Sequence, residues 1–307
     1  MSGAECMVFQ QVIIHPGDIV HLTANLHPME PLYSGPPHLD FDHPMVMGIL
    51  NATPDSFHSG SRVNRDNAMA MAADMIQQGA DMLDLGGQSS RPGATKIGPD
   101  QEWERIAPIL QGLVDRWPRM TVSVDTFHAK VAEKAIRAGA RMVNDISAGT
   151  LDPDLPHVVA EHGVPFVMMH MQGTPKTMQV APHYQDVVSE VFAHLSERVG
   201  HMRSLGIEQL ILDPGFGFGK RIEDNYGLLS RLLELQGLGC PLLVGLSRKS
   251  MIYNALNLTP EEALNGSTAL HAWALERGAD ILRVHDVAPA VECVRLHQYL
   301  RGSQLGS

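Results

Sequence analysis

The sequence predicts an α/β fold, a single (β/α)8 TIM barrel that carries a short N-terminal extension. Eight short apolar runs recur along the 307 residues, separated by longer segments with helical spacing. Buried parallel strands that alternate with helices give this pattern. Each run ends in, or directly before, a polar residue, and the carboxyl ends of barrel strands form the face that carries an active site. We therefore expect these polar residues to meet at one mouth.

The strands and helices are expected to alternate along the chain as a barrel requires. The expected strands are residues 46–50, 81–84, 122–125, 141–144, 166–169, 210–213, 242–246 and 281–285. The expected helices are about 66–78, 101–115, 128–138, 152–162, 183–205, 248–257 and 260–277, and a last one that begins near Ala288. Long loops follow the first two strands, and loops of this length in a compact domain are seldom idle.

Composition and charge set the domain plan and exclude several classes of partner. Residues 1–38 fit no barrel unit and are expected to form an N-terminal arm, followed by the barrel at 39–300 and a disordered tail at 301–307. The net charge of −11 argues against a nucleic-acid surface, because such binding depends on Lys and Arg. Three scattered cysteines indicate no disulfide framework and suit a reduced cytoplasm. No membrane span or secretory signal is apparent.

Acidic and amide side chains end four of the expected strands. Asp84, Asp125 and Asp213 end strands two, three and six, and Asn144 ends strand four. One such residue would be interpreted as a turn former or helix cap, but four at one mouth favour a site. Such a site can hydrogen-bond a heterocycle with adjacent N–H donors, because a carboxylate accepts two bonds at once while an amide and a lysine satisfy the ring acceptors.

Metal binding is the other use of such a cluster, since some barrel hydrolases collect His and Asp ligands from several strands. The first strand here has no HxH pair, and only His170 and His285 lie at strand ends. A di-zinc hydrolase is therefore poorly supported.

The segment DPGFGFGK (213–220) lacks the spacing of a P-loop or of a dinucleotide-binding fingerprint. Its alternating glycines suit a tight loop against a flat ligand, with Phe216 or Phe218 available to stack. Among the cations near strand ends, Arg248 is interpreted as a solvated surface charge. Arg283 points into the barrel, where an unpaired guanidinium is not tolerated, so an anion bound at the mouth would account for it.

These motifs resemble the dihydropteroate synthase family. The matching motifs are MGILNATPDSF (47–57), GGQSSRPGA (86–94), SVDT (123–126), ND (144–145), MHMQGTPKTMQ after strand five, LDPGFGFGK (212–220), LLVGLSRKS (242–250) and RVHDV (283–287). The resemblance covers about residues 39–296. It implies a cytoplasmic transferase that condenses 6-hydroxymethyl-7,8-dihydropterin diphosphate with 4-aminobenzoate, giving 7,8-dihydropteroate and pyrophosphate in folate synthesis. It also implies Mg2+ as cofactor and a homodimer.

The resemblance further implies a role for each matching residue. Those implied to bind the pterin or to line its site are Asp84, Asp125, Asn144, Met169, Asp213, Phe218, Gly245 and Lys249. Asn51 is implied to bind Mg2+, and those implied at the diphosphate oxygens are Ser90, Arg283 and His285. Those implied to frame the aminobenzoate pocket, which is also the sulfonamide pocket, are Phe57, Arg91, Pro92, Lys249 and Ser250. The implied catalytic residues are Asp125, Asp213, Lys249 and Arg283.

The sequence departs from the family pattern in its first two loops. Gln88 replaces a usual Glu, Ser90 replaces a usual Thr, and HSGS (58–61) replaces SDGG. Two alternatives are weighed against the synthase. Pterin-binding methyltransferases share the barrel and the pterin site, but the SRKS and RVHD motifs argue against them. A non-catalytic paralogue that binds pterin is supported only by the loop departures.

Overall fold

The structure is a computed structural model that describes residues 39–52, 61–88, 97–174, 177–178 and 181–304. The expected N-terminal arm at residues 1–38 lies outside the described residues, so it stays a prediction. The strands are β1 Met45–Asn51, β2 Met82–Gly86, β3 Thr121–Asp125, β4 Met142–Asp145, β5 Phe166–Met169, β6 Leu210–Asp213, β7 Leu243–Val244 and β8 Ile281–Val284. The α-helices are α1 Ser61–Gln77, α2 Pro99–Arg116, α3 Ala129–Arg137, α4 Leu155–His162, α5 Val187–Ser204, α6 Ile222–Ser230, α7 Ser250–Leu256, α8 Leu264–Glu276 and α9 Val287–Gln304. Two 3-10 helices are η2 Leu232–Leu238 and η3 Glu261–Ala263.

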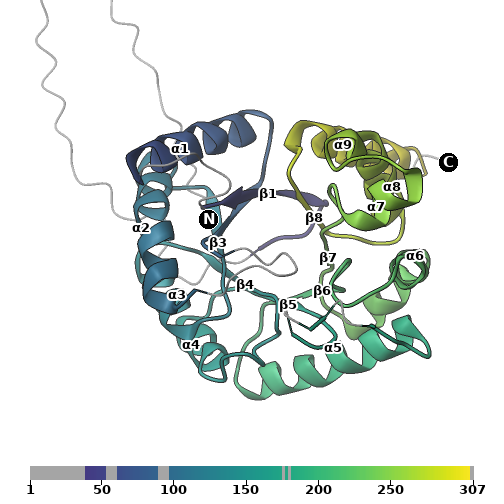
Figure 1. The fold of residues 1–307 in the computed structure, drawn as a ribbon, viewed down its shortest axis with the longest axis horizontal. Coiled ribbons are helices and arrows are strands. Elements are labelled where there is room, and N and C mark those ends of the chain that lie inside the picture. The colour runs from purple at the N-terminus through teal and green to yellow at the C-terminus, as the bar shows by residue number, and fades with distance from the viewer. Residues whose placement is uncertain (1–38, 53–60, 89–96, 175–176, 179–180, 305–307) are drawn as a thin grey trace, which may run out of the picture. The chain divides into compact units, whose positions relative to one another are not determined.

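The eight strands form one parallel sheet in the order β6-β5-β4-β3-β2-β1-β8-β7. A parallel bridge joins Leu212 of β6 to Leu242, the residue before β7, so the sheet is nearly closed into a ring. Helices cover the outside of this ring (Figure 1). The predicted (β/α)8 barrel is confirmed.

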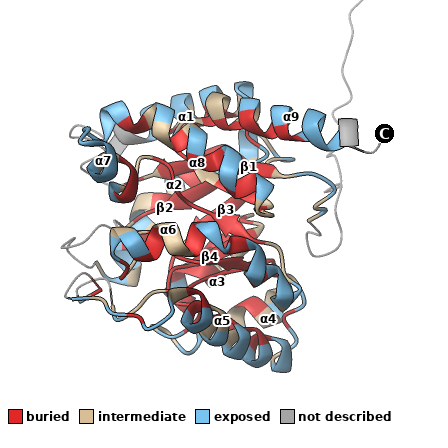
Figure 2. Ribbon diagram, turned by 90° about the vertical axis from the view of Figure 1, so that its right-hand side faces the viewer, coloured by how far each residue is buried: buried red, intermediate tan, exposed pale blue. Residues whose placement is uncertain are grey.

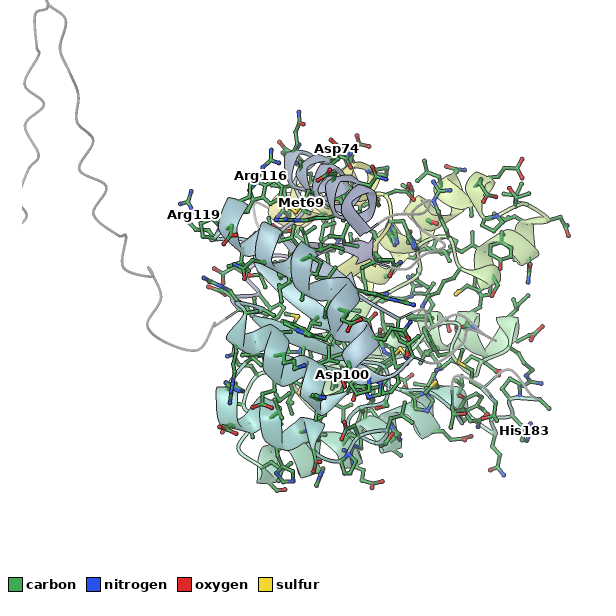
Figure 3. All side chains as sticks on the ribbon, turned by 60° about the vertical axis from the view of Figure 1, so that its left-hand side comes forward. Met69, Asp74, Asp100, Arg116, Arg119 and His183 are labelled. Carbon is green, nitrogen blue, oxygen red and sulfur yellow. The ribbon has the colours of Figure 1, made fainter. Side chains whose placement is uncertain are left out.

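The helices that cover the barrel bury their inner faces and expose their outer ones (Figure 2). Local chemistry sets several helix ends. Pro99 opens α2 with acidic Asp100 in the first turn, where the helix dipole favours negative charge. Asp100 lies on the outer surface (Figure 3). There it also forms an ion pair of 2.7 Å with Lys130 of α3. None of the described helices combines the length and the apolar character that crossing a membrane requires.

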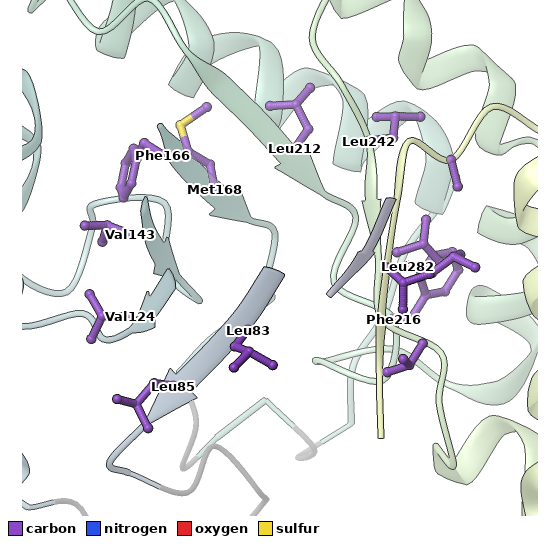
Figure 4. Packing of buried hydrophobic residues seen from close by; sticks show 14 of the residues in the cluster. Leu83, Leu85, Val124, Val143, Phe166, Met168, Leu212, Phe216, Leu242 and Leu282 are labelled. Carbon is purple, nitrogen blue, oxygen red and sulfur yellow. The ribbon is translucent and has the colours of Figure 1, made fainter. Parts of the chain in front are cut away.

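Alternate residues of each strand face opposite sides of the barrel wall. Leu83 and Leu85 of β2, Val124 of β3 and Leu282 of β8 face outward and join the large cluster between strands and helices (Figure 4). A separate cluster fills the barrel interior at the amino-terminal ends of the strands. We call it the barrel floor, and its members are Met45, Met47, Met82, Met142, Val167, Ile211, Leu243 and Ile281.

Three details of the fold differ from the expectations. Strand β7 is two residues long rather than five, and it lies between Pro241, which has no N–H to donate, and Gly245, which favours irregular backbone. Helix α6 and 3-10 helix η2 follow the glycine-rich loop, where no helix was expected. Helix α9 continues to Gln304, so the prediction of a disordered tail is wrong for residues 301–304.

Candidate active site at the carboxyl ends of the strands

Five polar side chains from different strands lie inside the barrel, above the floor. We call this group the mouth cluster, and it consists of Asp84, Asp125, Asn144, Asp213 and Arg283. Asp84, Asn144, Asp213 and Arg283 each stand two positions after a floor residue of the same strand, so they face the same side of the barrel wall. Asp125 ends β3, which contributes no residue to the floor. The regular alternation of the strands therefore brings together residues up to about 200 positions apart in sequence, as the Arg283–Asp84 pair shows.

Arg283 is the centre of the mouth cluster. Its Nε donates to Oδ2 of Asp84 at 2.6 Å, and its Nη2 donates to Oδ2 of Asp125 at 2.8 Å. Asn144 also donates to Oδ2 of Asp84, at 2.9 Å. From the sequence, a bound anion would account for the buried guanidinium of Arg283. Two carboxylates of the protein already pair with it, so its burial alone does not require that anion.

Burial changes the protonation of the acids in this cluster. Removal from water raises the pKa of Asp125, opposed by the positive charge of Arg283 and assisted by the carboxylate of Asp84. Burial likewise raises the pKa of Asp213, opposed by the charge of Lys249. The site thus holds more carboxylates than one guanidinium can neutralise, and Lys249 supplies the further cation that this balance requires.

Lys249, which follows β7, reaches over the glycine-rich loop. Its Nζ donates to the carbonyl oxygen of Phe216 and lies 4.9 Å from the centroid of the Phe218 ring. Burial lowers the pKa of Lys249 to about 8, although the nearby Asp213 favours the charged form. A Cβ at Gly217 would lie 3.3 Å from the Lys249 side chain, so the glycine leaves space for the lysine to pass.

An apolar wall adjoins the mouth cluster, since its member Met169 lies opposite Asp213 in the sheet register. Phe127, Ile146 and Met169 form a buried cluster, and Phe218 is partly buried against it. An apolar face beside a ring of hydrogen-bonding groups suits a flat heterocycle, which presents a hydrophobic face and a polar edge.

Comparisons with known proteins agree with this geometry. The sequence profile of the pterin binding enzyme family matches residues 47–285. The dihydropteroate synthase of Escherichia coli K12 is 46% identical over 261 residues, which cover 84% of this chain and 92% of that protein. The structure of Xanthomonas albilineans dihydropteroate synthase with 4-aminobenzoic acid is similar with a TM-score of 0.80 and 43% identity, over 86% of this chain and 95% of that one. The Yersinia pestis dihydropteroate synthase in complex with a sulfonamide drug gives a TM-score of 0.82 and 41% identity, over 86% and 96% of the two chains.

The chain belongs to the dihydropteroate synthase family. Its activity is therefore that of a transferase, which condenses the pterin diphosphate with 4-aminobenzoate. The matched relatives carry the synthase name, so the methyltransferase alternative has no support.

The family motifs around β7 and β8 take two different roles. Ser247 Oγ accepts a hydrogen bond from the backbone N–H of His285 at 3.2 Å, and it lies 3.1 Å from Nδ1 of the same residue. These two contacts hold the exposed His285 at the end of β8. Arg248 forms a paired salt bridge with Asp286, through bonds of 2.7 and 2.9 Å. The interpretation of Arg248 as a solvated charge is therefore wrong, because it fastens the loop after β7 to the end of β8.

Several predicted site residues cannot be placed, and one residue of the site was missed. Those outside the described residues are Phe57, Ser90, Arg91 and Pro92. Gln88 is described, and its Oε1 accepts the backbone N–H of Ile97 at 2.9 Å across the ends of loop two. Ser250 is exposed at the start of α7. Gly245 is buried, and a Cβ added to it would lie 3.6 Å from Lys249 Nζ. The sequence reasoning missed Lys220, whose position inside a glycine-rich loop was the available signal.

The residues at the end of β1 fit the Mg2+ that the family implies. Asn51 lies opposite Gly86 in the sheet register, and a Cβ on that glycine would meet the amide oxygen of Asn51 at 3.4 Å. No described residue donates a hydrogen bond to this oxygen. The described residues include no group of three or more His, Cys, Asp or Glu side chains able to hold a metal. A single amide oxygen is consistent with Mg2+, which takes few protein ligands and completes its shell with water and substrate phosphates.

Proposed function

We propose that the mouth cluster binds the polar edge of the dihydropterin ring and thereby orients its diphosphate-bearing carbon toward 4-aminobenzoate. One observation supports this most strongly. One carboxylate oxygen of Asp125 accepts a hydrogen bond from Arg283, and one carboxylate oxygen of Asp213 accepts a hydrogen bond from the backbone N–H of Gly215 at 2.8 Å. The second oxygen of each receives no hydrogen bond from the described residues. These two acceptor oxygens, together with the donor Lys249 near Asp213, complement a ring edge that carries both N–H and carbonyl groups.

The apolar wall would hold the faces of the ring. Met169 is buried and Phe218 is partly buried in one cluster, and both are large enough to cover a bicyclic ring. One amide N–H of Asn144 donates to Asp84, so its amide oxygen and its other N–H would be available to the ligand. Asp84 is fully buried, so its role is to hold Arg283 and Asn144 in place.

The reaction breaks the bond between the exocyclic carbon and the diphosphate oxygen, and it forms a bond from that carbon to the arylamine nitrogen. The bonding electrons leave with pyrophosphate, and the amine loses one proton. Positive charge that develops on the ring would be stabilised by Asp125 and Asp213, while Arg283 and His285 would receive the departing anion. A Mg2+ ion held by Asn51 would add neutralising charge to the diphosphate.

The experiment is a paired assay of pyrophosphate release and dihydropteroate formation, with Mg2+ and with or without 4-aminobenzoate. We expect product only when both substrates are present. Lys249→Ala and Asp213→Ala should each lower the rate by about 10²–10³-fold, the effect of removing a group that stabilises developing charge. Lys130→Ala on the outer surface of α3 is the matched control and should keep the rate. Pterin binding without aminobenzoate-dependent product would overturn the synthase proposal in favour of a non-catalytic pterin-binding protein.

A homodimer through the late helices is a second part of the proposal. Large apolar side chains are exposed on the last two helices, with Trp273 of α8 at 55%, Leu296 of α9 at 66% and Tyr299 of α9 at 79%. Apolar surface of this kind supports a protein interface. Light scattering should give twice the chain mass, and Tyr299→Glu should give a monomer. A cytoplasmic location is supported by the free thiols of Cys240 and Cys293.

A further inference from the structure

The loop after β6 is folded around the ammonium group of Lys220. This side chain is only 4% exposed, and its Nζ donates to the carbonyl oxygens of Gly215 at 2.9 Å and Phe218 at 3.2 Å. Its third contact is Nδ1 of His170, at 2.9 Å. An ammonium group has three N–H donors, so every donor of Lys220 has a partner.

The contact with His170 fixes the state of that ring. Burial lowers the pKa of Lys220 to about 7, although the nearby Asp213 favours its charged form. The charged ammonium group can only donate, so in that state Nδ1 of His170 accepts and the ring proton sits on Nε2. Burial, assisted by the charge of Lys220, lowers the pKa of His170 to about 2, so the ring stays neutral. His170 follows β5 directly, so this hydrogen bond attaches the loop after β6 to the neighbouring strand.

The same loop is held from another point by Lys249. The carbonyl of Phe216, which lies between the two carbonyls that Lys220 binds, accepts Nζ of Lys249. Gly215 and Gly217 have positive φ angles of 71° and 79°, which allow neighbouring peptide groups to turn toward different partners. Lys220 and Lys249 thus bind three carbonyls of one short loop, those of Gly215 and Phe218 for Lys220 and that of Phe216 for Lys249.

We infer that Lys220 is a positioning residue for pterin binding. It sets the place of the Phe216 carbonyl and the Phe218 ring, and these two groups in turn set the place of the Lys249 ammonium. Lys220 is buried beneath the loop and does not itself reach the ligand. The inference rests on the proposed function, because it takes Lys249 as a donor to the pterin ring.

The test is a double-mutant cycle on the full chain, with 6-hydroxymethylpterin as the probe and its Kd as the readout. Lys220→Met keeps the length of the side chain and removes its donors. We expect it to weaken binding about tenfold in the wild-type background and less than about twofold in the Lys249→Met background, since coupled residues are non-additive. Lys130→Met is the matched surface control and should leave Kd unchanged. An equal weakening in both backgrounds, or no weakening in the wild-type background, would overturn the inference.

A second pair of variants guards against loss of folding in Lys220→Met. His170→Asn keeps an acceptor oxygen near the place of Nδ1, whereas His170→Leu removes it. We expect the Asn variant to bind within about threefold of wild type and the Leu variant to lose about tenfold, the effect of leaving a buried donor unsatisfied. Equal affinities of the two variants would contradict the inference. Because these assays read binding, a wild-type chain that binds pterin but forms no product would overturn the proposed function alone.

Discussion

The barrel interior has two layers, the apolar floor and the mouth cluster, built from the same strands. Met82 of β2 and Met142 of β4 belong to the floor, and two positions further along each strand stand Asp84 and Asn144. Burial of a methionine side chain stabilises the fold by about 1.5–3 kcal/mol. Buried charges carry a large desolvation penalty that their mutual attraction barely offsets. Two residues along a strand thus separate side chains that stabilise the fold from side chains that are available to bind the ligand.

The first test of this contrast removes the centre of the mouth cluster. Arg283→Met should lower the free energy of unfolding by about 3–5 kcal/mol, because Asp84 and Asp125 remain buried with uncompensated charge. Adding Asp84→Asn and Asp125→Asn should restore most of that stability and none of the activity. Chemical denaturation and the product assay together measure both quantities. If Arg283→Met and wild type have equal free energies of unfolding, the buried charges of the mouth cluster do not destabilise the fold and the contrast with the floor fails.

The second test removes a side chain of the floor. Met142→Ala should lower the free energy of unfolding by about 2–5 kcal/mol, because Met142 is 0% exposed and the surrounding barrel cannot close the cavity. The KM for the pterin diphosphate should stay at its wild-type value at a temperature where the variant is folded. Met71→Ala, at a position 40% exposed on α1, is the control and should change stability by less than about 0.5 kcal/mol. A raised KM in Met142→Ala would show that the floor also shapes the site.

The two-layer arrangement was largely predictable from sequence. Asp84, Asp125, Asn144 and Asp213 end short apolar runs, and a barrel brings the carboxyl ends of its strands to one mouth. The placement of Met169 beside Phe218 was implied by the family resemblance and agrees with their common cluster.

The partners of the charged groups were not predictable. The two carboxylates on Arg283 depend on the stagger between strands that lie far apart in sequence, and no local pattern encodes that stagger. The role of Lys220 depends on backbone carbonyls, which every residue has, so its hydrogen bonds leave no mark on the sequence. The salt bridge of Arg248 with Asp286 was also missed because it depends on how two strand ends are staggered, which no local pattern encodes.

A buried acid outside the barrel gives a third test, of what burial does to a carboxyl group. Glu102 of α2 is 1% exposed, its Oε2 has no hydrogen-bond partner, and His128 Nε2 lies 3.9 Å away. Burial raises the pKa of Glu102 from its ordinary 4.5 to about 7. The folded state therefore binds more protons than the unfolded state in this window, so stability falls as the pH rises from about 4.5 to about 7.

Glu102→Gln should remove that pH dependence. We expect the variant to be more stable than wild type by about 1–3 kcal/mol at pH 8, where the buried carboxylate is ionised, and about equal at pH 4.5. Denaturant melts of both proteins at the two pH values measure the difference. Glu104→Gln, at an exposed position of the same helix, is the control and should differ from wild type by less than about 0.5 kcal/mol at both pH values. A constant difference across pH would mean that Glu102 has the same pKa in the folded and unfolded states, so that burial does not shift it.

The smallest effect is expected at Gln88, where this chain departs from its family. The only described side-chain contact of Gln88 is the bond from the backbone N–H of Ile97 to its Oε1, and a glutamate oxygen can accept the same bond. Gln88→Glu should therefore change stability by less than about 0.5 kcal/mol and leave the KM for 4-aminobenzoate and the inhibition constant of a sulfonamide within about twofold. Gln88→Leu leaves the Ile97 N–H without its acceptor and should cost about 1 kcal/mol. If Gln88→Glu changes the inhibition constant of the sulfonamide about tenfold, the charge at position 88 acts on the ligand. The main role of this side chain would then not be the hydrogen bond to Ile97.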